Sequence, residues 1–216
     1  MNALAFAYPV LAVIAAYLLG SLSFGVIVSR ALGLNDPRTF GSKNPGATNV
    51  LRSGSKVAAI VTLLLDAAKG WLPVVLVQAY GQPYGLGEGT LAGVGFAAFI
   101  GHLYPVFFRF QGGKGVATAL GVLLGLNIWL ALATLLTFAI MAFFFRYVSL
   151  ASIVAAVFAP AYLLLGDGVA WQASRASLLA VAVMGLLLVW RHRLNIDRLL
   201  AGKEAKLDAK KSGPSA

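Results

Sequence analysis

Four basic polar segments, three of them containing glycine, hold the side chains that could do chemistry in this otherwise apolar sequence. The first, GSKNPGATNVLR at positions 41–52, places hydroxyl, amide and guanidinium groups beside glycine and proline. Hydroxyls and amides can donate hydrogen bonds to an anion, and a guanidinium can bind a phosphate through two parallel N–H bonds. The segment therefore predicts an anion site, with the candidate residues Ser42, Asn44, Thr48, Asn49 and Arg52. Gly46 after Pro45 also favours a type II turn, which needs a positive φ at its third residue.

The second segment, GHLYPVFFRFQGGKGVAT at 101–118, has the composition of a phosphate-binding loop. Its glycines leave backbone N–H groups accessible to an oxyanion, and the helix expected from Val116 adds partial positive charge. It is not a Walker A loop, because Phe108 and Gly115 stand where that motif needs glycine and a magnesium-binding hydroxyl, so we expect no nucleotide hydrolysis. The alternative is that the glycines only let the chain turn at the membrane interface. The candidate residues are Gly112, Gly113, Lys114 and Gly115.

The elements that must position these segments are apolar. With 60% hydrophobic residues, 11% charged residues and a mean hydropathy of +0.85, the sequence predicts an all-α polytopic membrane protein. The absence of cysteine excludes a thiolate nucleophile and a thiolate metal site, and the two histidines and seven carboxylates form no recognisable metal-ligand pattern. We expect no metal and no cofactor. The apolar runs lie at 4–28, 57–77, 91–108, 116–126, 128–145, 150–165 and 173–190.

Charge distribution decides how the middle runs are read. A single helix over 116–145 would be about 45 Å long, so we expect a break near 125–127 and seven spans. That break places nearly all of the 17 lysines and arginines on one side, which predicts an outside N-terminus and a cytoplasmic C-terminus. We expect one membrane domain over 1–205 and a basic, disordered tail over 206–216. The four polar segments, 41–52, 101–118, 146–152 and 191–204, then share the cytoplasmic face.

Three further titratable residues lie within the apolar runs. Asp66 and Lys69 are three residues apart on one helical face, so we expect a buried ion pair that supports the site, with a substrate contact by Lys69 as the alternative. His102, between Gly101 and Pro105, suits helix-end packing or hydrogen bonding as well as it suits substrate binding. We leave it outside the catalytic set.

Segments 41–52, 101–118 and RHRLNIDRLLAGKE at 191–204 resemble, in order, the three signature motifs of the acyl-phosphate:glycerol-3-phosphate acyltransferases, the PlsY family of bacterial inner-membrane enzymes. Lys43 departs from the glycine that is common in the first motif. The resemblance implies transfer of a fatty acyl group from acyl phosphate to the 1-hydroxyl of glycerol 3-phosphate. The products would be lysophosphatidate and phosphate, in the first acylation step of phospholipid synthesis. It also implies a functional link to the enzyme that supplies acyl phosphate.

The resemblance assigns roles to the matching positions. It implies the catalytic residues Ser42, Arg52, Lys114, His192 and Asn195. Substrate-binding positions would be Asn44, Thr48, Asn49, Gly112, Gly113, Gly115, Ser149, Ser152, Arg193, Arg198 and Glu204. Acyl phosphate is already an activated anhydride, so alignment and charge neutralisation are the main requirements. We hypothesise that the substrate phosphate accepts the hydroxyl proton, while a general-base role for His192 stays open.

Two other function classes are compatible with parts of the sequence. A transporter of an anionic phosphorylated solute would need polar residues along several spans, whereas the polar groups here gather at one face. An HxxxxD acyltransferase would use the spacing of His192 and Asp197, but that family carries its motif on a soluble α/β domain. Membrane lipid is the expected environment, no nucleic acid partner is expected, and the oligomeric state is left open.

Overall fold

The computed structural model describes residues 3–207, with side chains from residue 7 onward, and confirms the all-α prediction. Within that range, β structure is limited to an isolated bridge between Asp167 and Trp171. The long helices are α1 (Ala3–Gly20), α4 (Lys56–Tyr80), α5 (Glu88–Leu103), α7 (Ile128–Phe145), α8 (Val148–Leu165) and α9 (Arg175–Arg191). The shorter ones are α2 (Phe24–Ala31), α3 (Ala47–Val50), α6 (Val116–Leu126) and α10 (Arg193–Leu200), with 3-10 turns η1 (Leu51–Ser53), η2 (Gln82–Tyr84) and η3 (Val106–Phe108).

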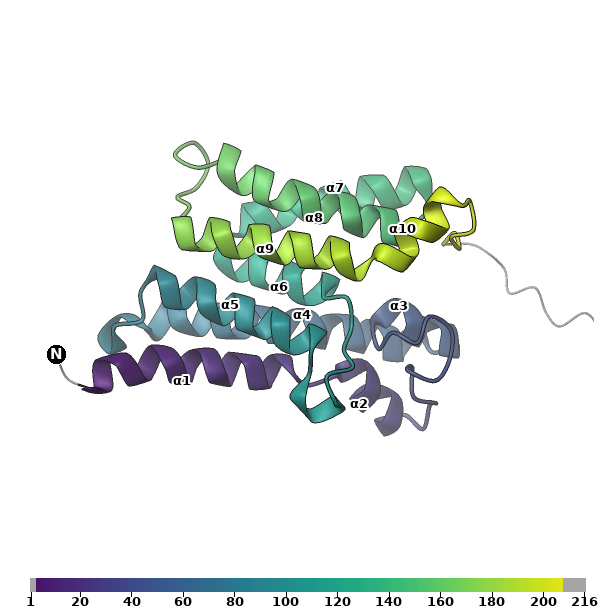
Figure 1. Cartoon of the computed structure of the whole chain (residues 1–216), viewed down its shortest axis with the longest axis horizontal. Coiled ribbons are helices and arrows are strands. Elements are labelled where there is room, and N and C mark those ends of the chain that lie inside the picture. The colour runs from purple at the N-terminus through teal and green to yellow at the C-terminus, as the bar shows by residue number, and fades with distance from the viewer. Residues whose placement is uncertain (1–2, 208–216) are drawn as a thin grey trace, which may run out of the picture.

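The helices form two groups with α6 between them (Figure 1). One group holds α1 to α5, the other holds α7 to α10, and the most extensive packing joins α4 to α6, α1 to α5 and α7 to α8. Glycine permits the α4–α6 contact, because a Cβ on Gly70 would collide with the Thr118 carbonyl and one on Gly121 with the Ala67 carbonyl. Such close approach of backbones is typical of helix pairs in membranes.

Four segments are long and apolar enough to cross a membrane, namely α4, Glu88–Phe108, α7 and α8. The number rises to six if two bent pairs each count as one span: α1 with α2, bent by 45°, and α9 with α10, bent by 55°. The run predicted at 4–28 is therefore broken, at residues 21–23. Helix α6 has only 11 residues, about 16 Å at 1.5 Å per residue, or half of the hydrocarbon thickness.

The break expected near 125–127 is present. Helix α6 ends at Leu126 and α7 begins at Ile128, with Asn127 between them. The Asn127 side chain caps α7, since its Oδ1 accepts hydrogen bonds from the N–H groups of Trp129 (2.9 Å) and Leu130 (3.1 Å). Because this cap starts a new helix at Ile128, the apolar run forms two helices rather than one.

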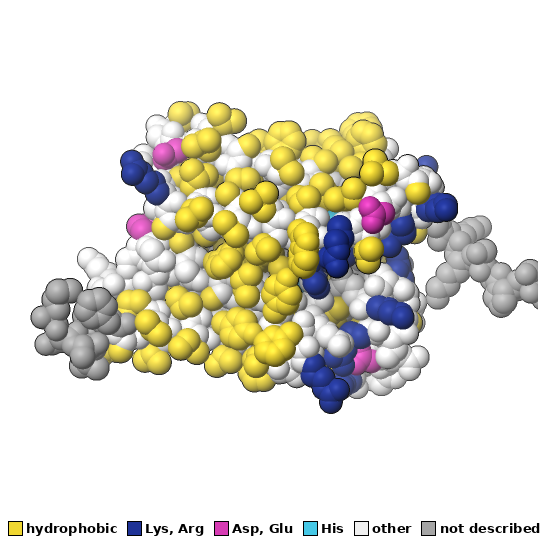
Figure 2. Space-filling model, viewed as in Figure 1, with side chains coloured by type: hydrophobic (Ala, Val, Ile, Leu, Met, Phe, Trp, Pro, Cys, Tyr) yellow, Lys and Arg dark blue, Asp and Glu magenta, His cyan; other side chains and the backbone are white. Residues whose placement is uncertain are grey.

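The surface divides into an apolar body and a basic end. Figure 2 shows hydrophobic side chains over the middle of the molecule, and Lys and Arg side chains gathered at the end where α3 and α10 lie. Large side chains such as Leu64, Leu136 and Leu186 are exposed by 60% or more, which suits contact with lipid. Of the predicted tail, residues 208–216 lie outside the described residues, while the Leu207 N–H donates to the Arg146 carbonyl (2.8 Å).

Candidate active site

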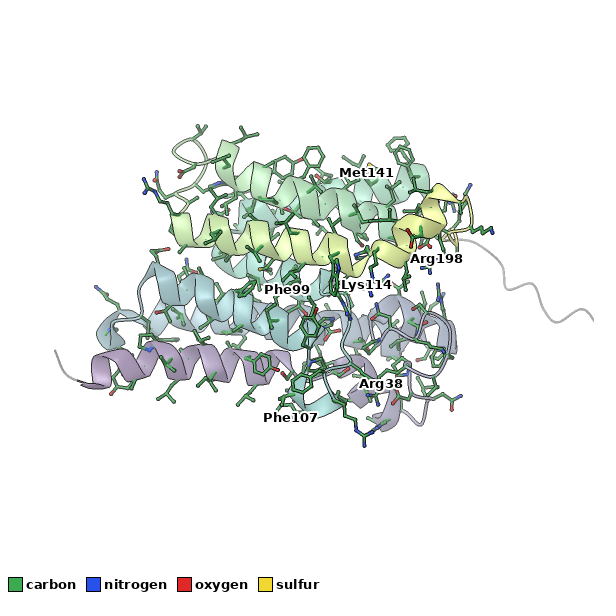
Figure 3. All side chains as sticks on the ribbon, viewed as in Figure 1. Arg38, Phe99, Phe107, Lys114, Met141 and Arg198 are labelled. Atoms are coloured by element: carbon green, nitrogen blue, oxygen red, sulfur yellow. The ribbon has the colours of Figure 1, made fainter. Side chains whose placement is uncertain are left out.

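The second, third and fourth polar segments meet through a chain of hydrogen bonds at the basic end. Lys114 Nζ donates to Asn195 Oδ1, and Asn195 Nδ2 donates to Glu204 Oε1 (2.6 Å). The same oxygen accepts from Ser149 Oγ (2.7 Å), and the other carboxylate oxygen accepts from Arg198 Nε (2.7 Å). Five predicted site residues from three separate segments are thus brought together (Figure 3 labels Lys114 and Arg198).

Electrostatics make this cluster suitable for an anion. Burial lowers the pKa of Lys114 to about 8; Glu204 opposes that shift, whereas Arg198, Arg191 and Arg52 add to it. Arg52 belongs to the first segment, so all three motifs contribute charge around Lys114. An anion placed here would relieve repulsion among cations and replace lost hydration.

Glu204 is held as a carboxylate. Burial alone would raise its pKa, but hydrogen bonds from Asn195, Arg198 and Ser149 hold the pKa below the ordinary glutamate value. Both carboxylate oxygens are engaged by protein donors. Its direct partners are therefore side chains, and it fixes which way the Asn195 amide faces.

His192 lies immediately after α9 and is 2% exposed. Its Nδ1 is 2.8 Å from the Leu188 carbonyl, so this nitrogen carries the proton and Nε2 is the acceptor. Burial, followed by the charge of Lys114, lowers the pKa of His192 to about 4. The imidazole is neutral at physiological pH. The HxxxxD spacing forms no dyad through Nδ1, since that atom faces Leu188, and Asp197 is exposed.

Asn49 organises the first segment. It is 2% exposed, its Nδ2 donates to the carbonyls of Pro37 (2.7 Å) and Phe40 (3.1 Å), and its Oδ1 accepts from the Ser42 N–H (3.0 Å). Arg52 Nη1 lies 3.4 Å from the same Oδ1. These bonds fold the segment around Asn49, so its side chain is already occupied by the loop.

The turn expected at Pro45 and Gly46 is wrong. Gly46 has φ −82° and precedes α3, and its N–H donates to Asn44 Oδ1 (3.1 Å). Positive φ occurs instead at Gly41 (58°) and at Lys43 (55°). Lys43 thus adopts the left-handed conformation that favours glycine, which explains why glycine would suit that position.

The remaining predicted residues lie less centrally. Ser42 and Thr48 have exposed side chains on the first segment. Ser152 is 2% exposed, and its Oγ donates to the Val148 carbonyl one turn earlier in α8 (2.8 Å). Arg193 is exposed and its guanidinium lies 4.6 Å from the centre of the Trp190 ring. Within the part of the chain that the structure describes, neither Ser152 nor Arg193 is hydrogen-bonded to Lys114.

The glycine loop, residues 112–115, is held between two side chains that the candidate set omits. On one side the Gly113 N–H donates to the His102 carbonyl (3.1 Å), and a Cβ on Gly113 would collide with the His102 ring. On the other, Arg191 donates to the Gly112 and Gly113 carbonyls, both at 2.9 Å. Arg191 was predictable only as one more cytoplasmic cation, although it stands directly before His192 in the third motif.

The buried ion pair is confirmed. Lys69 Nζ lies 2.8 Å from Asp66 Oδ1, with side chains 1% and 3% exposed. His102 Nδ1 lies 3.5 Å from the same oxygen.

Comparisons with known proteins point to a single family. Residues 10–202 match the family model described as glycerol-3-phosphate acyltransferase. A glycerol-3-phosphate acyltransferase of Albidiferax ferrireducens is 70% identical over 203 residues, covering 94% of this chain and 91% of the relative. One of Ralstonia pickettii is 61% identical over 198 residues, covering 92% and 93%.

Two solved structures share the fold. A crystal structure of PlsY, an integral membrane glycerol 3-phosphate acyltransferase, in its glycerol 3-phosphate form, has a TM-score of 0.84 and 40% identity, covering 92% of this chain and 95% of PlsY. Its lysophosphatidic acid form has a TM-score of 0.81 and 39% identity, with the same coverage. With three motifs assembled at one end and relatives that match along nearly their whole length, this chain belongs to the glycerol-3-phosphate acyltransferase family.

Proposed function

We propose that this protein transfers a fatty acyl group from acyl phosphate to the 1-hydroxyl of glycerol 3-phosphate, forming lysophosphatidate and inorganic phosphate. The observation that carries the proposal is the position of Lys114, which is bonded to Asn195 and lies within electrostatic range of Arg52, Arg191 and Arg198. Two phosphorylated substrates require such a concentration of cations. The solved PlsY forms, described with glycerol 3-phosphate and with lysophosphatidic acid, support the acceptor and the product.

In the proposed reaction, the hydroxyl oxygen attacks the carbonyl carbon of acyl phosphate. The new ester C–O bond forms as the bond between that carbon and the phosphate oxygen breaks, and the phosphate leaves with the electron pair. The hydroxyl proton passes to a phosphate oxygen. Ser42, Arg52, Lys114, His192 and Asn195 orient the substrates and neutralise charge. The neutral His192 Nε2 is the alternative proton acceptor, weak because its pKa is low.

The other candidate residues have supporting roles in this proposal. Asn44 and Asn49 shape the first segment, Glu204 and Ser149 orient Asn195, and Gly112, Gly113 and Gly115 bring backbone close to the bound phosphate. Exposed cations at Arg193 and Arg198 attract the anionic substrates. Thr48 would also shape the first segment, and Ser152 would line the acyl-phosphate site from α8.

The active site would face the cytoplasm of a bacterial inner membrane. Seven crossings would put the N-terminus outside, with the 11-residue α6 as the shortest of them. The gathering of Lys and Arg at one end supports this orientation. Because the sequence has no cysteine, single substitutions can test it. A membrane-impermeant maleimide applied to intact cells should label Gln172→Cys and spare Thr39→Cys; the reverse pattern would refute the orientation.

Turnover by the purified protein tests the function itself. Detergent-solubilised protein is given palmitoyl phosphate and glycerol 3-phosphate, and phosphate release is followed beside a parallel reaction with palmitoyl-CoA. We expect turnover with palmitoyl phosphate only, and loss of at least a hundredfold in Arg52→Ala and Lys114→Ala. Arg175→Ala, which removes a cation at the first residue of α9, is the matched control. A folded wild type that turns over neither donor would exclude the proposed reaction, and transport of glycerol 3-phosphate into liposomes by that protein would favour the transporter.

A further inference from the structure

A buried triad of charged and polar side chains lies beneath the glycine loop. Asp66 and Lys69 come from α4 and His102 from α5, and their side chains are 3%, 1% and 8% exposed. Asp66 Oδ1 is 2.8 Å from Lys69 Nζ and 3.5 Å from His102 Nδ1. Burying such groups is expensive, and well-packed apolar residues generally stabilise a core at least as well. Stability alone therefore does not account for the triad.

The lysine end of the triad holds the break between α1 and α2. Lys69 Nζ donates to the Leu22 carbonyl (2.6 Å), one of the groups in the gap between these helices, and lies 5.5 Å from the centre of the Phe24 ring. Helix α2 in turn packs closely against the first motif. The two backbones are so near that a Cβ on Gly25 would collide with the Pro45 carbonyl. Lys69 is thus connected to the first motif through the Leu22 carbonyl and α2.

The histidine end holds the glycine loop. The His102 carbonyl accepts the Gly113 N–H (3.1 Å), and the imidazole packs directly on the Gly113 backbone. Lys114 is the next residue. Through Asp66, the side chain that supports Gly113 is linked to the side chain that supports α2.

We infer that Lys69, Asp66 and His102 are positioning residues that couple the first motif to the glycine loop and so set the spacing between the groups that bind the two substrates. The inference rests on the proposed function. None of the three needs to touch substrate for this role. This positioning role takes the place of the substrate contact by Lys69 that the sequence left as an alternative. Lys69 Nζ is already engaged by Asp66 and by the Leu22 carbonyl.

Two variants interrupt the triad at different ends. Asp66→Asn/Lys69→Met removes both charges together, which avoids leaving one buried charge without its partner. His102→Gln removes the ring that packs on Gly113 and keeps a polar side chain. The control Thr137→Val deletes another hydrogen bond within the membrane helices, between Thr137 Oγ1 in α7 and the Tyr162 hydroxyl in α8 (3.0 Å).

The readout is KM for glycerol 3-phosphate and for palmitoyl phosphate, because loss of folded enzyme lowers the maximal rate without changing KM. We expect each triad variant to raise KM for at least one substrate tenfold or more, while Thr137→Val stays within twofold of wild type. Lys69→Arg keeps the positive charge, so its KM values should lie between those of wild type and those of Asp66→Asn/Lys69→Met. A folded triad variant with both KM values within twofold of wild type would overturn the inference.

Two other results also have a definite meaning. If neither triad variant folds while Thr137→Val does, the triad supports the whole fold rather than the loop spacing, and the inference is wrong. If wild type itself does not turn over either donor, the proposed reaction fails first, and that failure is visible before any variant is compared.

Discussion

Replacing Arg191 by lysine tests whether the glycine loop needs a forked donor or only a positive charge. Arg191 Nη2 donates to the carbonyls of Gly112 and Gly113, both at 2.9 Å, and Nε donates to Gly113 at 3.2 Å. A lysine has one compact ammonium group on a flexible stem and cannot reproduce this geometry. Arg191→Lys therefore keeps the charge and removes the fork.

The size of the effect follows from these bonds. A hydrogen bond to a charged group contributes about 1.5–3 kcal/mol. Arg191 is only partly buried, so water can replace some of the hydrogen bonds lost in the variant, and the lower end of this range applies. A loss of about 1.5 kcal/mol in ordering the loop corresponds to roughly a tenfold rise in KM for the substrate whose phosphate the loop holds.

KM for both substrates, measured with thermal unfolding of the same samples, checks this value. Arg191→Met, which also removes the charge, should raise KM further than Arg191→Lys. Arg175→Lys makes the same exchange at the other end of α9 and should leave KM unchanged. If Arg191→Lys keeps both KM values within twofold of wild type, the charge alone suffices and the argument from the fork is refuted.

Three other substitutions give separate tests. Because burial lowers the pKa of Lys114 to about 8, KM for a phosphorylated substrate should rise as pH increases through 8, and Lys114→Arg should flatten that rise in a pH series. Between pH 8 and about 10.5 the unfolded chain binds more protons at this lysine, so its contribution to folding becomes more favourable with pH, as chemical denaturation can verify. Glu204→Gln removes the charge on which Asn195 and Arg198 converge and should lower kcat/KM at least tenfold at neutral pH; unchanged kinetics would contradict its orienting role. Lys43→Gly should change thermal stability by less than about 1 kcal/mol, because relief of left-handed strain offsets the greater freedom of the unfolded chain.

The sequence predicted the helical elements well because their signal is local. Apolar runs and a polar Asn127 are enough to place α7 and to separate it from α6. The bend after Gly20 was missed, since residues 21–23 lie inside a continuous apolar run and their break is supported from α4 by Lys69. The short run predicted at 116–126 matches α6, which has 11 residues.

For the candidate site, the sequence likewise predicted local features but not the contacts between distant segments. Motif residues such as Lys114 and Asn195 could be named from the sequence, but Arg191 could not be paired with Gly113, 78 residues earlier, without the fold. The type II turn at Gly46 was wrong because Asn44 and the start of α3 determine that backbone. Local turn preferences were overridden by a side-chain hydrogen bond and a helix start.

The arrangement around Lys114 explains why one small site draws on segments so far apart in the chain. A lysine this buried needs a negative group nearby, and Glu204 supplies that charge through Asn195 rather than by direct contact. A direct Lys114–Glu204 ion pair would compete with a substrate phosphate for the ammonium group. Placing the neutral Asn195 amide between them keeps the lysine charged and oriented, while leaving an anionic substrate as the strongest partner that the lysine can meet.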